Sequence, residues 1–174
     1  AQSETVWHQA DKYHVPRIAF INKMDREGAD FFGTVKEIEE RLEAHPVPIT
    51  LPIGCGPPHM PDPFRGVIDL VEMKALRFLP ETNGREVLQE EIPSGMQEEA
   101  QFWRAHLLDR LSNYSDEMIE LLLADQPVPA DLIRRVLRQA TIHHRIVPVL
   151  CGSALDGIGV QPVMDAVVDY LPSP

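Results

Sequence analysis

The stretch Ile18-Ala19-Phe20-Ile21-Asn22-Lys23-Met24-Asp25 predicts how the chain folds. Its first four residues are apolar, as in a strand that is buried on both faces of a parallel sheet. Its last four residues stand where that strand would end. In an open α/β sheet, ligands bind just beyond the carboxyl ends of the strands. We therefore expect a ligand-binding loop over residues 22–25.

The pattern Asn-Lys-x-Asp at a strand end suits the recognition of guanine. An ionised carboxylate only accepts hydrogen bonds, so Asp25 can receive two parallel bonds from N1–H and the 2-amino group of guanine. Adenine lacks both donors, and a site built to bond polar groups rejects such an analogue by on the order of 10⁴-fold. Asn22 can bond base N7 or brace a neighbouring loop, and Lys23 can lay its methylene stem over the base. The same residue types are common in ordinary strand-to-loop turns, so the tetrapeptide alone leaves both interpretations open.

A second loop of this kind follows the apolar run over residues 149–151. The backbone N–H of Ala154 can donate to O6 of guanine, and the hydroxyl of Ser153 can hold the turn. Small side chains let the backbone approach a base closely. Alone this loop is a weak signal, but with residues 22–25 it completes a guanine pocket formed by Asn22, Lys23, Met24, Asp25, Ser153, Ala154 and Leu155.

The order of elements around the first loop predicts a parallel sheet. A helix is expected over residues 2–14 and a strand over 17–21, followed by an amphipathic helix with Asp30 as its N-cap. The last strand, 146–151, precedes a helix over 160–170. Helix and strand thus alternate at both ends of the chain, as in an α/β fold.

The middle of the chain has a different composition, with seven prolines between residues 46 and 63. Strands are expected over 48–53, 66–71, 74–79 and 86–92, with Asn83-Gly84 as a hairpin dipeptide and a long turn over 54–64. Apolar residues at helical spacing from Met96 to Met118 predict a helix, and Ser115 is expected to be the N-cap of a second helix within this range. Pro129 fits the first turn of another helix. The fold class is therefore α/β: part of a sheet with helices, interrupted by an α+β insertion. The segments are 1–45, 46–141 and 142–174.

Composition excludes several classes of protein. The 174 residues include 44% hydrophobic and 25% charged residues, and no apolar run approaches the roughly 20 residues of a membrane helix. Two cysteines, Cys55 and Cys151, give neither a disulfide framework nor metal-ligand spacing, as in a reduced cytoplasmic protein. The pair His143-His144 is expected at the surface without metal. A net charge of −11 argues against direct sequence-specific nucleic-acid binding.

Most of the negative charge lies in the insertion. Residues 81–125 contain eleven acidic residues and three arginines, a net charge of −8. Such residues can simply solvate helix faces, or they can attract an electropositive protein partner. Arg134, Arg135 and Arg138 mark one basic helix face, expected to be solvated or, less often, to contact a ribosome.

The chain resembles the GTP-binding domain of bacterial elongation factor G, a translational GTPase. The likeness is strongest in Asn22 to Phe32, in Gly66 to Lys74 and in the ending Asp169-Tyr170-Leu171-Pro172-Ser173-Pro174. The resemblance implies that the sheet is part of a P-loop-GTPase-type sheet, with GTP or GDP as ligand and the ribosome as partner. It also implies that the insertion is the family's extra subdomain, which contacts the C-terminal domain of the ribosomal stalk protein. A cytoplasmic monomer is expected.

The chain departs from this family in two respects. It contains no Gly-x-x-x-x-Gly-Lys-[Ser/Thr] loop, and the family's Asp-x-x-Gly switch is missing from its place before Asn22. We therefore expect no catalytic residue and no metal ligand in this chain. The parts that bind magnesium and phosphate would lie upstream, so the fragment should not hydrolyse GTP. The alternatives are a piece of another ribosomal GTPase, such as a ribosomal protection factor or class-three release factor, or a protein-binding module.

Overall fold

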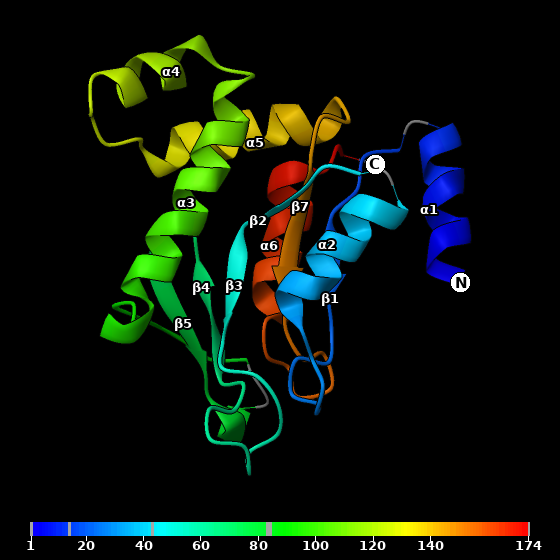
Figure 1. Ribbon diagram of the computed structural model, residues 1–174, viewed down its shortest axis with the longest axis vertical. Coiled ribbons are helices and arrows are strands. Elements are labelled where there is room, and N and C mark those ends of the chain that lie inside the picture. Colours follow the sequence, from blue (N-terminus) through cyan, green and yellow to red (C-terminus); the bar gives the residue numbers. More distant parts are fainter. Residues whose placement is uncertain (1, 14, 43, 83–84, 174) are drawn as a thin grey trace.

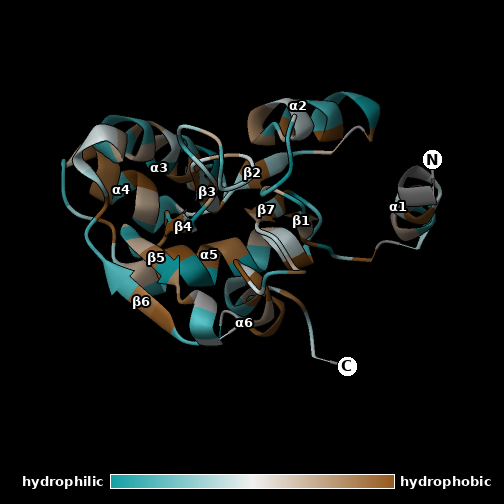
Figure 2. Cartoon of the chain, turned by 90° about the horizontal axis from the view of Figure 1, so that it is seen from below, coloured by the Kyte–Doolittle hydropathy of each residue, from teal (hydrophilic) through white to brown (hydrophobic). Residues whose placement is uncertain are grey.

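The fold combines a three-stranded parallel sheet with a four-stranded antiparallel sheet (Figure 1). The computed structural model describes residues 2–13, 15–42, 44–82 and 85–173. The mixed α/β architecture with an insertion is the predicted fold class. The sheets lie side by side, with the helices distributed over their faces (Figure 2).

The parallel sheet is formed by both ends of the chain. Its strands are β1 (Ala19–Ile21), β2 (Pro46–Pro48) and β7 (Val147–Cys151), in the order β1-β7-β2. Helix α2 (Phe31–Arg41) lies on one face and α6 (Val160–Tyr170) on the other, while α1 (Gln2–Lys12) lies to one side (Figure 2). The N-cap at Asp30 is confirmed, because its carboxylate accepts a hydrogen bond from Gly33 N–H at 3.1 Å. The last residue of the expected first helix, His14, lies outside the described residues.

The strand expected over 48–53 is in fact two strands that belong to different sheets. β2 pairs with β7 in parallel, and Ile49 N–H donates to Val149 O at 2.9 Å. At Thr50 the chain turns away into β3 (Thr50–Ile53), and the Thr50 hydroxyl accepts from Cys151 N–H at 3.2 Å. A side-chain oxygen thus replaces the next bond of the ladder, which lets the backbone leave the parallel sheet. The first residues assigned to the insertion, Pro46–Pro48, therefore pair within the parallel sheet.

The antiparallel sheet has the order β3-β4-β5-β6, with β4 (Gly66–Asp69), β5 (Lys74–Phe78) and β6 (Val87–Glu90). Short 3₁₀ helices, η1 (Pro80–Thr82) and η2 (Ser94–Met96), flank β6. The expected strand over 66–71 ends early because the Asp69 carboxylate accepts from Val71 N–H at 2.9 Å and folds a turn. The hairpin dipeptide Asn83-Gly84 lies outside the described residues.

Three helices follow this sheet in the chain: α3 (Gln97–Ser112), α4 (Asp116–Leu123) and α5 (Ala130–Ile142). Ser115 is confirmed as the N-cap of α4, since its hydroxyl accepts from Met118 N–H at 3.1 Å. Ala100, Leu107 and Leu111 of α3 are fully buried. Tyr114 does not continue their stripe as expected, because α3 has already ended and the ring is 43% exposed.

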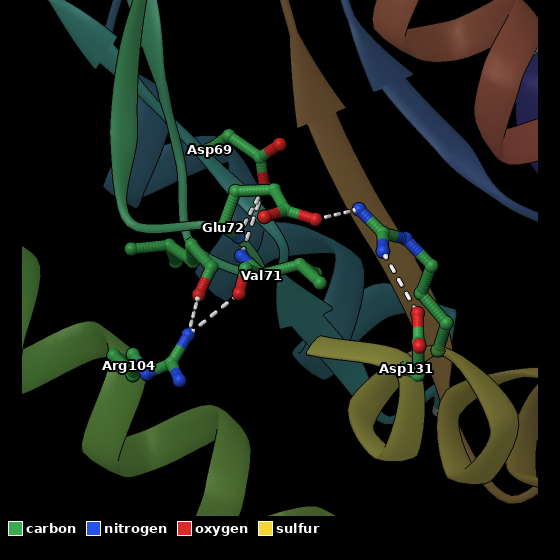
Figure 3. A network of polar contacts seen from close by, with 7 residues as sticks. Asp69, Val71, Glu72, Arg104 and Asp131 are labelled. Atoms are coloured by element: carbon green, nitrogen blue, oxygen red, sulfur yellow. Dashed lines mark hydrogen bonds and ion pairs between the residues drawn. The ribbon is translucent and has the colours of Figure 1, made fainter. Parts of the chain in front are cut away.

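Arginines of α3 and α5 bond the turn after β4 and other helices, and Figure 3 shows the contacts around that turn. Arg104 donates to Leu70 O and Val71 O, each at 2.7 Å, and to Val128 O at 3.3 Å. On α5, Arg134 bonds Glu72, Arg135 bonds Glu117 and Arg138 donates to carbonyls at the end of α6; the latter two have bond lengths of 3.0 and 3.1 Å. The expected basic face of α5 is thus largely engaged in contacts within the chain. Within the described residues, no helix is long and apolar enough to cross a membrane.

Candidate guanine-binding site

The two loops singled out in the sequence meet at one end of the parallel sheet, the lower end in Figure 1. The side-chain oxygen of Asn22 accepts a hydrogen bond from Ala154 N–H at 2.9 Å. Behind this contact, Gly152 N–H donates to Ile21 O at 3.0 Å and Met24 N–H donates to Gly152 O at 3.1 Å. Loops separated by about 130 residues in the sequence are therefore joined by one side-chain bond and two backbone bonds.

The Asn22 bond changes the expected role of Ala154. The sequence predicts that Ala154 N–H points at O6 of guanine, whereas in the structure this donor is bonded to Asn22. Of the two roles considered for Asn22, the structure shows the bracing of the neighbouring loop. A base that takes the Ala154 donor has to displace the Asn22 oxygen, which frees the Asn22 amide for a second contact.

Met24 lies in the core and is 1% exposed. Its carbonyl accepts from Gly56 N–H at 2.9 Å, so the loop is also tied to the insertion. Any contribution of Met24 to a base site is therefore structural, through packing and the backbone.

Two exposed side chains flank the contact between the loops. Lys23 has a left-handed backbone (φ +62°), which is uncommon for a residue with a β-carbon and marks a constrained loop. Leu155 is 89% exposed. The stem of Lys23 and the side chain of Leu155 are both available to cover the faces of a planar ligand.

The second loop is held in a tight turn. Ser153 is buried, and its backbone exchanges hydrogen bonds with Ile158 at 2.8 and 3.0 Å. Gly159, at φ +83°, closes the turn, and a β-carbon there would lie 2.4 Å from Cys151 O. Glycine is therefore required at this position by both conformation and space.

Asp25 is poised to remain ionised. Burial acts to raise its pKa, but hydrogen bonds with the side chains of Ser153 and Asp156 outweigh this, so the pKa lies below its ordinary value. An acceptor-only carboxylate is what the proposed bonds to guanine require.

Asp156 is a component that the sequence reasoning missed. Its carboxylate lies 3.3 Å from the Ser153 hydroxyl. Its pKa is raised by burial and then by the hydrogen bond and charge of Asp25. At low pH the proton is therefore taken up by Asp156 before Asp25. Its position three residues after Ser153 in a glycine-bounded turn was the available signal.

A cavity of about 370 Å³ borders residues 21–24 on the side of α2. Thr34 and Glu37 line it, but Asp25 and the second loop do not. Ala154 and Leu155 are exposed and Asp25 is partly exposed, so the groups expected to meet a base lie at the surface.

Comparison with known proteins identifies the family and the fold of the chain. Residues 1–173 match the model of the elongation factor Tu GTP-binding domain. A solved protein structure from Thermus thermophilus has the same fold, with a TM-score of 0.80 at 24% identity. That match covers 98% of this chain, which spans 24% of the longer Thermus chain. The chain belongs to the family of the elongation factor Tu GTP-binding domain.

Proposed function

We propose that this chain forms the guanine-recognising part of a ribosome-associated translational GTPase of the elongation factor G type, which catalyses translocation of transfer RNA and messenger RNA. The observation that carries this proposal is the bond between Asn22 Oδ1 and Ala154 N–H, which brings the two candidate base-binding loops together. Asp25 reads N1–H and the 2-amino group, Ala154 and Asn22 meet the O6 and N7 edge, and Lys23 and Leu155 cover the ring. Ser153 and Met24 hold the loops.

The phosphates and magnesium of GTP are assigned to residues outside this chain. The chain has no phosphate-binding loop of the Gly-x-x-x-x-Gly-Lys type, and it spans about a quarter of the Thermus chain that shares its fold. The fragment thus supplies base selectivity to a larger enzyme of the cytoplasm. The proposed division is 1–45 and 142–174 for the GTP-binding part and 46–141 for the inserted subdomain, except that Pro46–Pro48 belong with the parallel sheet of the GTP-binding part.

The inserted subdomain is proposed to bind the C-terminal domain of the ribosomal stalk protein. Glu98, Glu99 and Glu120 are exposed on α3 and α4, in the segment with a net charge of −8. Leu122 and Leu123, which follow Glu120 closely on α4, are 38% and 84% exposed. An acidic group next to exposed apolar side chains fits a basic partner that also buries an apolar contact. This favours a second role as a protein-binding module, which could operate without nucleotide.

Base recognition can be tested on the 174-residue chain by nuclear magnetic resonance. Guanosine, adenosine and xanthosine would be titrated into ¹⁵N-labelled protein. We expect guanosine alone to shift the amides of Lys23 and Ala154 in a saturable manner, and Asp25→Asn to abolish that shift. Asp109→Asn, an exposed change on α3, is the matched control and should behave as wild type. Equal responses to guanosine and adenosine would refute the proposal.

A further inference from the structure

The opposite end of the parallel sheet holds a small basic pocket, which we term the strand-entry pocket. Arg17 precedes β1, His45 precedes β2, and His144 and Arg145 precede β7. Because the three strands are parallel, these approach segments converge at one edge, the upper end in Figure 1. The four side chains and Trp7 line a cavity of about 90 Å³.

The charge of this pocket is opposite to that of the protein. The lining includes two arginines and two histidines, and no carboxylate is found among the described residues that line it. The chain as a whole carries −11. An anion bound in this pocket would interact favourably with both guanidinium groups.

The pocket is built on fixed backbone. Val147 N–H donates to His45 O at 2.9 Å, and Arg145 N–H donates to Ala140 O at 2.8 Å. His144 has a left-handed backbone (φ +60°) in the turn after α5. This turn carries the side chains of His144 and Arg145. The approach segments before β2 and β7 therefore cannot separate without breaking the backbone bond between His45 and Val147.

Arg17 is oriented by its neighbours. Its guanidinium lies 4.6 Å from the centre of the Trp7 ring and donates to Trp7 O at 3.1 Å, and its second terminal nitrogen lies 3.5 Å from Nδ1 of His144. By contrast, the exposed guanidinium of Arg145 makes no hydrogen bond or ion pair within the described part of the chain. One arginine is thus held in place by stacking, and the other remains available to close over a ligand.

We propose that the strand-entry pocket binds a phosphate group. The volume suits one tetrahedral anion, and guanidinium donors match the oxygens of a phosphate. The group can come from free phosphate or from the phosphodiester backbone of RNA, which share this chemistry. Backbone phosphates carry no sequence information, so an RNA ligand would be bound without sequence preference.

The test uses the 174-residue chain, with inorganic phosphate and a 12-nucleotide oligouridine as separate probes. Each would be titrated at constant ionic strength, with detection of the Arg17, His144 and Arg145 amides by nuclear magnetic resonance. We expect saturable shifts, and an affinity reduced about tenfold in Arg145→Gln, because a charge-assisted hydrogen bond is lost. Arg85→Gln removes the same charge from an exposed position of the insertion and should bind as wild type.

The two probes separate the sources of the phosphate. Binding of inorganic phosphate that depends on Arg145 supports a free anion as ligand. Arg145-dependent binding of oligouridine alone supports an RNA backbone, and the slope of log affinity against log salt should then fall by about 0.7 in Arg145→Gln. Arg145 is exposed, so this change leaves the fold intact, and thermal unfolding would verify it. No binding of either probe, or equal binding by Arg145→Gln and wild type, overturns the proposal.

Discussion

The loops at the exit of β1 and β7 and the acidic helices α3 and α4 present their functional groups in different ways. In the loops, backbone hydrogen bonds, a buried Met24 and a glycine that tolerates no β-carbon fix where Asp25 and Ala154 lie. On the helices, Glu98, Glu99 and Glu120 extend into solvent. Recognition by the loops thus depends on the exact position of each group, and recognition by the helices depends on their charge.

This difference sets the size of the effects that substitutions should have. A site that bonds specific polar groups loses its selectivity when one atom is exchanged. A surface that steers a partner by charge changes gradually and responds to salt. Substitutions in the loops should therefore outweigh those on the helices, and the following predictions test this order.

The largest effect is expected from Asp25→Asn in the full-length protein that contains this chain. The new amide donates to the 2-oxo group of xanthine, and it has one acceptor fewer for guanine. The ratio of affinities for guanosine and xanthosine triphosphates should change by on the order of 10⁴-fold toward xanthine. Competition binding measures that ratio.

Asp109→Asn is the control, because it removes an exposed carboxylate of α3, far from the two loops in the sequence, and leaves Asp25 in place. It should keep the preference for guanine. If Asp25→Asn retains the wild-type preference, Asp25 does not bind the base. The loops would then not recognise their ligand through groups held in fixed positions.

The next effect concerns the stability of the second loop. Gly159→Ala would place a β-carbon 2.4 Å from Cys151 O at φ +83°. We expect a loss of about 2–4 kcal/mol in the free energy of unfolding, measured with urea. Gly95→Ala, where nothing lies within 4 Å of the added carbon, should change it by about 0.5 kcal/mol or less. Equal losses for the two variants would show that the turn is not constrained as the structure indicates.

Local sequence patterns were sufficient to predict several of the helices, their caps and the strand before the first loop. The apolar run before Asn22, the caps at Asp30 and Ser115 and the helix over 160–170 were predicted and confirmed, because each depends on neighbouring residues. The division between β2 and β3 at Thr50 was not predicted. It depends on a bond to Cys151, a residue about 100 positions away.

Contacts between distant residues also decide the details of both ends of the sheet. The bond between Asn22 and Ala154 and the convergence of Arg17 with Arg145 follow from the strand order β1-β7-β2, which no single stretch encodes. Likewise, the arginines of α5 suggest a solvated face until their partners beyond β4, on α4 and at the end of α6 are known.

A smaller effect is expected on the acidic helices. Reversing Glu98, Glu99 and Glu120 to lysine should weaken binding of the stalk protein's C-terminal domain about tenfold at low salt, and less at high salt, because exposed charges are screened. The three residues are exposed while Leu107 and Leu111 are buried, so the fold should persist. Titration of the labelled stalk domain measures the affinity.

The control for this triple variant reverses Glu37, Glu39 and Glu40 on α2, which are exposed and carry the same total charge. It should bind the stalk domain as wild type, apart from a small effect of net charge. If both triple variants bind equally, or if salt has no influence, the acidic helices serve only as a solvated face.

The smallest effect is expected for the ion pair between Arg135 of α5 and Glu117 of α4. The bond is 3.0 Å long, but both side chains are 63% exposed. Water and salt screen such a pair, and both long side chains lose rotamer freedom on forming it. A double-mutant cycle with Arg135→Gln and Glu117→Gln should therefore give a coupling of about 0.2–1 kcal/mol.

Arg104 provides the contrast, since it is half-buried and donates to three carbonyls. Arg104→Gln should cost about 2–3 kcal/mol in urea unfolding, because it leaves partly buried acceptors without a donor. A coupling for Arg135 and Glu117 as large as the loss for Arg104 would mean that surface charge on this subdomain is as position-dependent as the loops, and the distinction drawn between the two regions would fail.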